Sequence, residues 1–275
     1  MNYNKPVCSI LRIRFDSSLP FLAQSYGYVR YMTSITRSGQ WFNRQASDPF
    51  VKNRIKWNLR SRSAFKLKEL QSKYNFMKPG QVVLDLGAAP GGWTQVALDA
   101  VWPDRAQSSS SDSILSRPKP TKHASSATVD GRVIAVDLLP IEPIDGAEIL
   151  LGDVHEDAVL QQIYTLAAYP YQPEGPVVDV VLSDMAHSFT GHRSTDAARV
   201  QNLCEFALSV ASHPWLLKPG GNFLCKYLRG DGDQELKKLC QSRFQQVIVT
   251  KPKASRQGSA EAYFLCLGFI ADNKA

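Results

Sequence analysis

The sequence has neither the long apolar runs of a membrane protein nor the cysteine motifs of a zinc or redox protein. No apolar run reaches the roughly 18 residues that a membrane-spanning helix needs, so we expect no membrane span. None of its cysteines belongs to a CxxC motif or to a Cys/His pair with zinc spacing. The five are Cys8, Cys204, Cys225, Cys240 and Cys266. Most stand in apolar stretches, which indicates buried free thiols in a reducing compartment and no metal site.

Acidic residues are scarce in the N-terminal quarter of the chain. Residues 1–78 contain 15 basic and 3 acidic side chains, whereas the remainder contains 17 basic and 22 acidic ones. The net charge of +7 therefore comes from the N-terminal region, and the body of the protein is mildly acidic. Clustered basic residues indicate an anionic partner such as nucleic acid. A chain of 275 residues, 44% of them hydrophobic, is long enough for one large domain.

Two segments have compositions that do not predict a packed core. Residues 1–47 carry six basic residues and one acid among many Ser, Thr, Tyr and Phe residues. This composition is typical of a mitochondrial transit peptide, with a disordered basic tail as the alternative, and predicts a matrix protein. Residues 104–130 are rich in Ser and Pro and have no hydrophobic period, so we expect a disordered surface insertion.

From residue 80 onward, short apolar runs alternate with helical patterns. Strands are predicted at 82–87, 132–138, 147–153, 177–184, 222–228, 245–251 and 262–270. Helices are predicted at 92–101, 155–168, 195–213 and 232–241, and an earlier one starts near Ser61. Near-continuous Val, Ile and Leu runs are typical of strands buried on both faces. The pattern therefore predicts an α/β fold with a mostly parallel, doubly wound sheet.

A glycine-rich turn, Asp85-Leu-Gly-Ala-Ala-Pro-Gly-Gly-Trp93, follows the first predicted strand and opens a helix. Glycines at such a turn let the backbone approach a ligand closely. The dinucleotide fingerprint GxGxxG is not met, because Ala89 occupies the second glycine position, and no GK[ST] phosphate loop is present. The turn therefore indicates a nucleotide-like ligand but disfavours NAD and ATP.

Further acids stand where strands of an open α/β sheet end, which is where such sheets bind ligands. Asp137 ends the second strand, where a carboxylate can accept from both hydroxyls of a ribose. Asp153 ends the third, where it can accept from an adenine amino group. For any single Asp, capping of the following helix is the simpler interpretation. Three acidic strand ends together with the glycine turn favour a ligand site.

Taken together, DLGAAPGGW, AVDLLP, LGD, LSDMA and EAYFLCLGF resemble the FtsJ (RrmJ) family of S-adenosylmethionine-dependent rRNA ribose 2′-O-methyltransferases. The resemblance covers residues 48–270 apart from the Ser-rich insertion, and the basic segment 48–70 is most like that of mitochondrial members acting on a large-subunit rRNA uridine. It implies a Rossmann-like methyltransferase fold, with a seven-stranded, mostly parallel sheet, a reversed last strand and helices on both faces. It also implies S-adenosylmethionine as cofactor, bound by Gly87, Pro90, Gly91, Gly92, Trp93, Asp137, Asp153 and Asp184.

The family carries a Lys-Asp-Lys-Glu tetrad, and the matching motifs here place it at Lys66, Asp184, Lys226 and Glu261. A ribose hydroxyl is a weak nucleophile, so its methylation needs a base or strong orientation. An ordinary Lys is protonated at neutral pH, but desolvation and a second cation lower the pKa of a Lys. Our hypothesis is that Lys226 is the base, that Lys66 supplies the second cation, and that Asp184 and Glu261 orient both. The alternative is a buried ion-pair network without chemistry.

The basic segment before Lys66 is the predicted RNA contact. Its basic residues are interleaved with Trp57 and Phe65, which suits phosphate contacts and base stacking; a solvated helix face is the alternative. The RNA-binding residues are predicted to be Lys52, Arg54, Lys56, Arg60 and Arg62. A second basic patch comprises Lys251, Lys253 and Arg256. Where family members commonly have Pro, this chain has His187, which is either a nucleic-acid contact or surface variation.

The resemblance implies that large-subunit rRNA, or a pre-ribosomal particle, is the partner of a monomeric enzyme. Two alternatives stay open. One is a 2′-O-methyltransferase of the same fold that acts on tRNA or an mRNA cap. The other is an rRNA-binding ribosome assembly factor whose catalysis is secondary.

Overall fold

The computed structural model describes residues 50, 53, 56–105, 130–170, 175–187, 190–230, 232–256 and 258–271. All of them belong to the compact unit Pro49–Ala275. The predicted transit peptide lies outside the described residues, as do Cys8 and residues 106–129 of the predicted insertion. Within the described ranges, no helix is long and apolar enough to cross a membrane.

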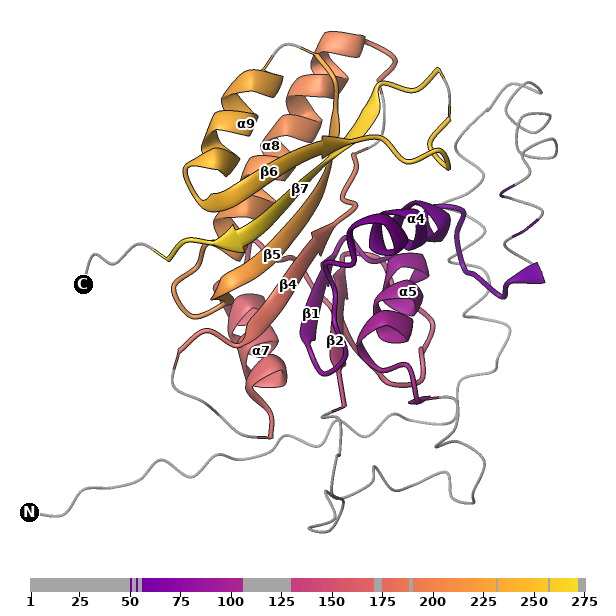
Figure 1. The fold of residues 1–275 in the computed structure, drawn as a ribbon, viewed down its shortest axis with the longest axis vertical. Coiled ribbons are helices and arrows are strands. Elements are labelled where there is room, and N and C mark those ends of the chain that lie inside the picture. The colour runs from indigo at the N-terminus through magenta and orange to yellow at the C-terminus, as the bar shows by residue number, and fades with distance from the viewer. Residues whose placement is uncertain are drawn as a thin grey trace, which may run out of the picture. The chain divides into compact units, whose positions relative to one another are not determined.

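A seven-stranded sheet forms the centre of the molecule, with helices on both faces (Figure 1). The strands are β1 (Val82–Leu86), β2 (Arg132–Asp137), β3 (Ala147–Leu151), β4 (Val178–Ser183), β5 (Leu217–Leu228), β6 (Phe244–Thr250) and β7 (Glu261–Phe269). Their order across the sheet is β3-β2-β1-β4-β5-β7-β6. The strands from β3 to β5 pair in parallel, and β7 is antiparallel to both β5 and β6. The prediction of a mostly parallel sheet with a reversed last strand is confirmed.

The helices divide between the two faces because each strand places alternate side chains on opposite sides. They are α4 (Ala64–Tyr74), α5 (Gly92–Val101), α7 (Asp157–Ala168), α8 (Arg193–Ala211) and α9 (Asp233–Gln241). On β1, Leu84 and Leu86 face the core formed with α7, α8 and α9, whereas Val83 faces the core formed with α4 and α5. Both cores are apolar, which explains why the central strands read as uninterrupted hydrophobic runs.

Strand β5 begins earlier than its sequence indicates. Leu217 pairs with Val178, the next pair is Asn222 with Val180, and the residues between them form a bulge. Pro219, Gly220 and Gly221 are typical of a turn, so the prediction started the strand only at residue 222. The bulge accommodates these turn residues while the strand continues on both sides.

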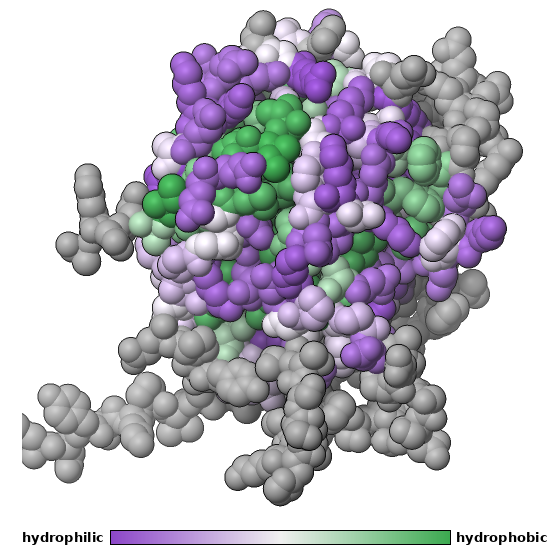
Figure 2. Space-filling view, in the orientation of Figure 1, coloured by the Kyte–Doolittle hydropathy of each residue, from purple (hydrophilic) through white to green (hydrophobic). Residues whose placement is uncertain are grey.

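The last two strands carry the largest apolar surface seen in Figure 2, which gathers over β6 and β7. The side chain of Val249 on β6 is 40% exposed, and Ile270 just after β7 is 46% exposed. Elsewhere this face of the molecule is mainly hydrophilic (Figure 2).

Candidate active site

Strand geometry brings the four residues of the predicted tetrad together on the face of the sheet that α4 covers. Lys226 on β5 stands directly opposite Tyr263 of β7. Glu261 lies two residues before Tyr263 and therefore on the same face. Asp184 follows the last residue of β4, and Lys66 comes from α4. Four elements that are distant in sequence thus supply one charged cluster.

The tetrad is organised as two ion pairs. Lys66 Nζ lies 2.7 Å from both carboxylate oxygens of Glu261. Lys226 Nζ lies 3.0 Å from Asp184 Oδ1 and donates a hydrogen bond to the backbone carbonyl of Asp184 at 2.6 Å. The four side chains are between 9% and 15% exposed. Charges this deeply buried are costly unless they are paired, so each ammonium and its carboxylate hold the other in place.

Glu261 is the best-connected member of the cluster. Besides Lys66, its Oε1 accepts from the hydroxyl of Ser255 at 2.8 Å and from that of Tyr263 at 3.1 Å. Burial favours the neutral acid, yet the charge and hydrogen bond of Lys66, the Ser255 hydroxyl and the charge of Lys226 together lower the pKa of Glu261. Glu261 is therefore a fixed anion that both lysines face.

Tyr263 joins the two ion pairs, and sequence reasoning did not single it out. It is completely buried, and its ring packs against Trp93 with centroids 5.9 Å apart. Burial, followed by the charges of Asp184 and Glu261, raises the pKa of Tyr263 well above its ordinary value. The hydroxyl therefore keeps its proton and serves as a donor. The alternation in EAYFL, which places Tyr263 on the face of Glu261, was the available signal.

The glycine turn packs so tightly that side chains are excluded at two positions. A Cβ on Gly92 would lie 2.0 Å from Ser61 Oγ, and one on Gly87 would lie 2.6 Å from Met185 Cγ. Gly87 also has a φ of +72°, a region that favours glycine. The turn is thus held between the segment that enters α4 and the segment that follows Asp184. Among the described residues, no side chain caps the N-terminus of α5, which leaves its first N–H groups as donors for an anionic group.

Two of the strand-end acids, Asp137 and Asp85, accept hydrogen bonds from the glycine turn or from the helix that follows it. Asp137 accepts from the backbone N–H of Ala89 at 2.9 Å and from that of Leu139 at 2.8 Å. Asp85 is completely buried and accepts from the Thr94 hydroxyl at 2.7 Å, while its Oδ1 has no hydrogen-bond partner. Burial raises the pKa of Asp85 to about 7, and the nearby charges of Asp184 and Asp137 add to the effect, against the Thr94 bond. The predicted contact of Asp137 with a ribose stays a prediction.

The surroundings of Asp153 fit a nucleoside. Its Oδ1 accepts from the backbone N–H of His155 at 2.9 Å and lies 2.7 Å from the His155 ring nitrogen Nδ1. These backbone and side-chain bonds lower the pKa of Asp153, so it is an anion at neutral pH. Beside the ends of β2 and β3, Leu138 is 68% exposed and Leu151 is 61% exposed. Exposed leucines next to carboxylates and a glycine turn suit a ligand with a planar base, a ribose and a charged tail. The residues present therefore fit S-adenosylmethionine.

The predicted RNA-binding residues divide into three groups. Lys52 and Arg54 lie outside the described residues, and Lys56 is exposed. The Arg60 guanidinium donates to the carbonyls of Glu142 at 2.5 Å and Pro143 at 2.6 Å, and Arg62 donates to that of Ala254 at 2.7 Å. These two arginines therefore have structural contacts within the chain, and their contact with RNA stays a prediction.

The second basic patch and His187 are also anchored. Glu69 on α4 accepts from the backbone N–H groups of Lys253 and Ala254, which fixes the segment before Glu261, and Lys253 itself is exposed. His187 is half-buried, with Nε2 3.1 Å from the carbonyl oxygen of Asp196. The two interpretations of His187 stay open.

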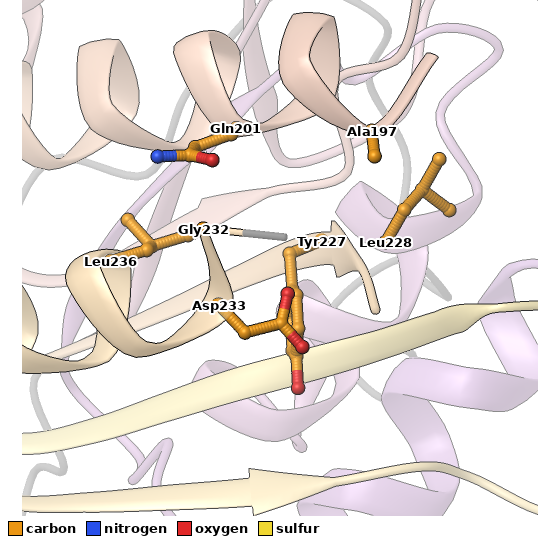
Figure 3. Close-up of a pocket in the computed structure, with 7 residues that line it drawn as sticks. All are labelled: Ala197, Gln201, Tyr227, Leu228, Gly232, Asp233 and Leu236. Atoms are coloured by element: carbon orange, nitrogen blue, oxygen red, sulfur yellow. The ribbon is translucent and has the colours of Figure 1, made fainter. Parts of the chain in front are cut away.

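A small cavity between α8, β5 and α9 is not part of this site (Figure 3). Its volume is about 10 Å³, and its lining includes Tyr227 and Asp233. Such a volume holds at most one water molecule. Tyr227 is adjacent to Lys226 on β5 and so faces the opposite side of the sheet.

The fold and site define a Rossmann-like methyltransferase, with a ligand turn after β1, acidic strand ends and a charged tetrad beside them. Comparison with known proteins shows that the chain belongs to the FtsJ-like methyltransferase family, whose model matches residues 59–269. It is an enzyme that uses S-adenosylmethionine. The activated methyl group of that cofactor is the chemistry it supplies when bound.

Relatives and one solved structure agree with the assignment. The chain is 42% identical over 244 residues to "Ribosomal RNA large subunit methyltransferase E" of Parvibaculum lavamentivorans, covering 88% of this chain and 86% of that protein. It is 42% identical over 229 residues to the protein of the same name in Leptothrix cholodnii, covering 83% and 89%. A candidate ribosomal RNA methyltransferase from Plasmodium falciparum superimposes with a TM-score of 0.58 at 26% identity, covering 77% and 99%.

Proposed function

We propose that this enzyme methylates the ribose 2′-hydroxyl of a uridine in mitochondrial large-subunit rRNA, free or in a pre-ribosomal particle, and supports ribosome biogenesis. The single observation that carries the reaction type is the pair of buried ion pairs beside the glycine turn, Lys66–Glu261 and Lys226–Asp184. The rRNA substrate is supported by the names of the bacterial relatives. The mitochondrial location and the uridine rest on the composition of residues 1–47 and the family resemblance.

In the proposed mechanism, the Lys226 ammonium first releases a proton to solvent, and its neutral Nζ then accepts the proton of the attacking hydroxyl. Asp184 holds this nitrogen through its carboxylate and its backbone carbonyl, so the position of Nζ is fixed before the RNA arrives. Lys66 contributes positive charge on the other side, and Glu261 and Tyr263 keep it in place. Alignment of the hydroxyl for in-line attack supplies the remaining acceleration.

A matched pair of lysine variants tests the reaction. Lys226 and Lys218 both lie on β5, and each forms an ion pair with an aspartate. Lys226 pairs with Asp184, directly after β4, and Lys218 pairs with Asp179 of β4 at 2.9 Å. We expect Lys226→Ala to abolish methyl transfer to rRNA, because the base is lost, while the protein still binds S-adenosylmethionine in calorimetry. Lys218→Ala should transfer methyl groups at the parent rate. Transfer by Lys226→Ala near the parent rate would refute the role of this lysine.

The substrate is tested by mapping ribose methylation on mitochondrial large-subunit rRNA in cells with and without the protein. The proposal expects one uridine to lose its methyl group, and re-expression of the parent protein, but not of Lys226→Ala, to restore it. An unchanged map would discard the substrate. Residues 1–47 fused to a fluorescent protein test the location, since a cytosolic signal would remove the support for a matrix enzyme.

A further inference from the structure

A cavity of about 440 Å³ lies outside the site described above, between the segment that enters α4, helix α5 and the connection from β2 to β3. Its lining includes Trp57, Asn58, Arg60, Gln95, Asp99 and Arg105. We refer to it as the Trp57 cavity. Its volume is sufficient for one nucleotide, because small-ligand sites in proteins begin at roughly 300 Å³. The chemistry proposed above for the tetrad and the glycine turn assigns it no role.

One residue of the lining is an exposed tryptophan, Trp57. The side chain is 56% exposed, although it is the largest apolar side chain a protein can bury. Lys68 on α4 places its ammonium 3.9 Å from the ring centroid, which is a cation–π contact. An exposed indole next to lysines is the arrangement with which proteins stack bases of single-stranded RNA. Lys56, adjacent to Trp57, is also exposed and supplies a second positive charge.

The segment that carries Trp57 is fixed on α5. The amide of Gln95 donates to the carbonyl of Asn58 at 3.0 Å and accepts from the backbone N–H of Arg60 at 2.8 Å. Asn58 itself has a φ of +51°, a turn conformation that asparagine tolerates. One side chain therefore bridges both ends of the turn. A platform that is already ordered loses little entropy when a base stacks on it.

The remaining lining favours a nucleotide over an apolar peptide. Polar and charged groups predominate, and they include both donors and acceptors, among them the Arg105 guanidinium, which lies 3.3 Å from Asp99 Oδ1. Groups of this kind suit the edges of a base and the hydroxyls of a ribose. An apolar peptide would leave them desolvated and poorly paired, whereas the lysines near Trp57 suit phosphates.

The Trp57 cavity shares structural parts with the active site. Arg60, which lines it, also lies 3.4 Å from the carbonyl of Pro90 in the glycine turn. The same segment of chain continues from Trp57 into α4 and reaches Lys66 nine residues later. An RNA held at Trp57 would therefore approach the tetrad along this segment.

We propose that the Trp57 cavity receives one unpaired nucleotide of the substrate RNA, with its base stacked on Trp57 and its flanking phosphates on Lys56 and Lys68. This inference rests on the proposed RNA methyltransferase function and names a further contact for the same substrate. The nucleotide in the cavity is a different one from the methylated nucleotide, since the cavity and the tetrad are separate.

Three variants of the full chain test the proposal. Trp57→Ala removes the platform, Trp57→Phe keeps an aromatic ring, and Tyr169→Ala is the matched control. Tyr169 is 51% exposed and also has a cation over its ring, that of Arg132, but lies in a different part of the fold, directly after α7. The probe is an unmodified transcript of mitochondrial large-subunit rRNA, with affinity measured at fixed salt. Calorimetry with S-adenosylmethionine and thermal unfolding report on the rest of the fold.

We expect Trp57→Ala to weaken RNA binding roughly tenfold or more, as for loss of one stacked base. Trp57→Phe should retain most of the affinity, Tyr169→Ala should bind like the parent, and affinity for S-adenosylmethionine should not change. Binding by Trp57→Ala within twofold of the parent, or an equal loss in Tyr169→Ala, would overturn the proposal. If the parent binds rRNA through Trp57 but methylates none, the proposed function fails and the cavity assignment stands.

Discussion

Asp85 is completely buried beneath the glycine turn, and burial raises its pKa to about 7, so its titration contributes to the pH dependence of stability. In the unfolded chain the pKa of this carboxyl is close to 3.8. The folded protein therefore binds the proton more tightly, and the stability that Asp85 contributes is present at low pH and is lost as pH rises toward 7.

The prediction compares the parent with Asp85→Asn, which mimics the neutral acid and does not titrate. Between pH 5 and pH 8, the free energy of unfolding of the parent should fall relative to that of the variant by about 3 kcal/mol, since a tenfold change in proton affinity corresponds to about 1.4 kcal/mol. Urea denaturation at several pH values measures the difference. A difference that is constant with pH would show that the carboxyl is ionised throughout.

At the scale of elements, the close packing of α5 against the segment before α4 depends on Gly92. Its Cβ position lies 2.0 Å from Ser61 Oγ and 3.3 Å from the backbone nitrogen of Ser61, so an added methyl group must displace backbone as well as a hydroxyl. Because this contact also positions the glycine turn, a substitution that disrupts it should also weaken cofactor binding.

We expect Gly92→Ala to lower the affinity for S-adenosylmethionine at least tenfold and to destabilise the fold by about 1–3 kcal/mol, as overpacking does. The control is Gly258→Ala, where nothing lies within 4 Å of the added atom. Calorimetry and thermal unfolding of both variants give the comparison. Equal behaviour of the two would contradict the importance of the contact.

Of all the structural features, the positions of helices and strands were predicted best from the sequence. Strands with uninterrupted apolar runs and a glycine turn have direct physical signatures, so β1 to β4 and α5 could be placed within a few residues. The early start of β5 could not, because Pro219, Gly220 and Gly221 have the local preference of a turn and only pairing with β4 keeps the strand.

The charged residues of the site could be predicted from the sequence, but their hydrogen bonds and pairing partners could not. Lys66, Asp184, Lys226 and Glu261 could be named from motifs, and the structure brings them together. That Tyr263 stands opposite Lys226 depends on the antiparallel register of β7, which no local pattern encodes. Its bond to Glu261, by contrast, follows from the alternation of side chains within the strand. Arg60 is predicted as an RNA contact, and the hydrogen bonds of its guanidinium to backbone carbonyls likewise depend on tertiary structure that no local pattern encodes.

At the scale of the whole molecule, outside residues 1–47 the positive charge is concentrated on one segment of a mildly acidic body. Residues 48–78 carry a net charge of +7, equal to that of the entire chain. Binding of RNA should therefore depend on phosphate contacts near this segment and should weaken as salt rises, with a slope set by the number of those contacts.

Replacement of single lysines measures this localisation. Lys56→Gln should reduce the slope of log affinity against log salt by about 1, as expected for one lost phosphate contact. Lys238→Gln on α9, an exposed lysine on the other face of the sheet, should leave the slope unchanged. Equal slopes for both variants and the parent would place the RNA elsewhere.

The position of β7 affects how the enzyme is made. Although β7 is the last strand to be synthesised, it lies inside the sheet, between β5 and β6 (Figure 1). During translation, β6 has no partner in the sheet until β7 emerges, and Glu261 and Tyr263 reach the lysines only then. The sheet and the charged cluster are therefore complete only after β7 has been synthesised. A chain that stops before residue 261 would lack Glu261 and Tyr263 and would leave unpaired strand edges on β5 and β6, which promotes aggregation.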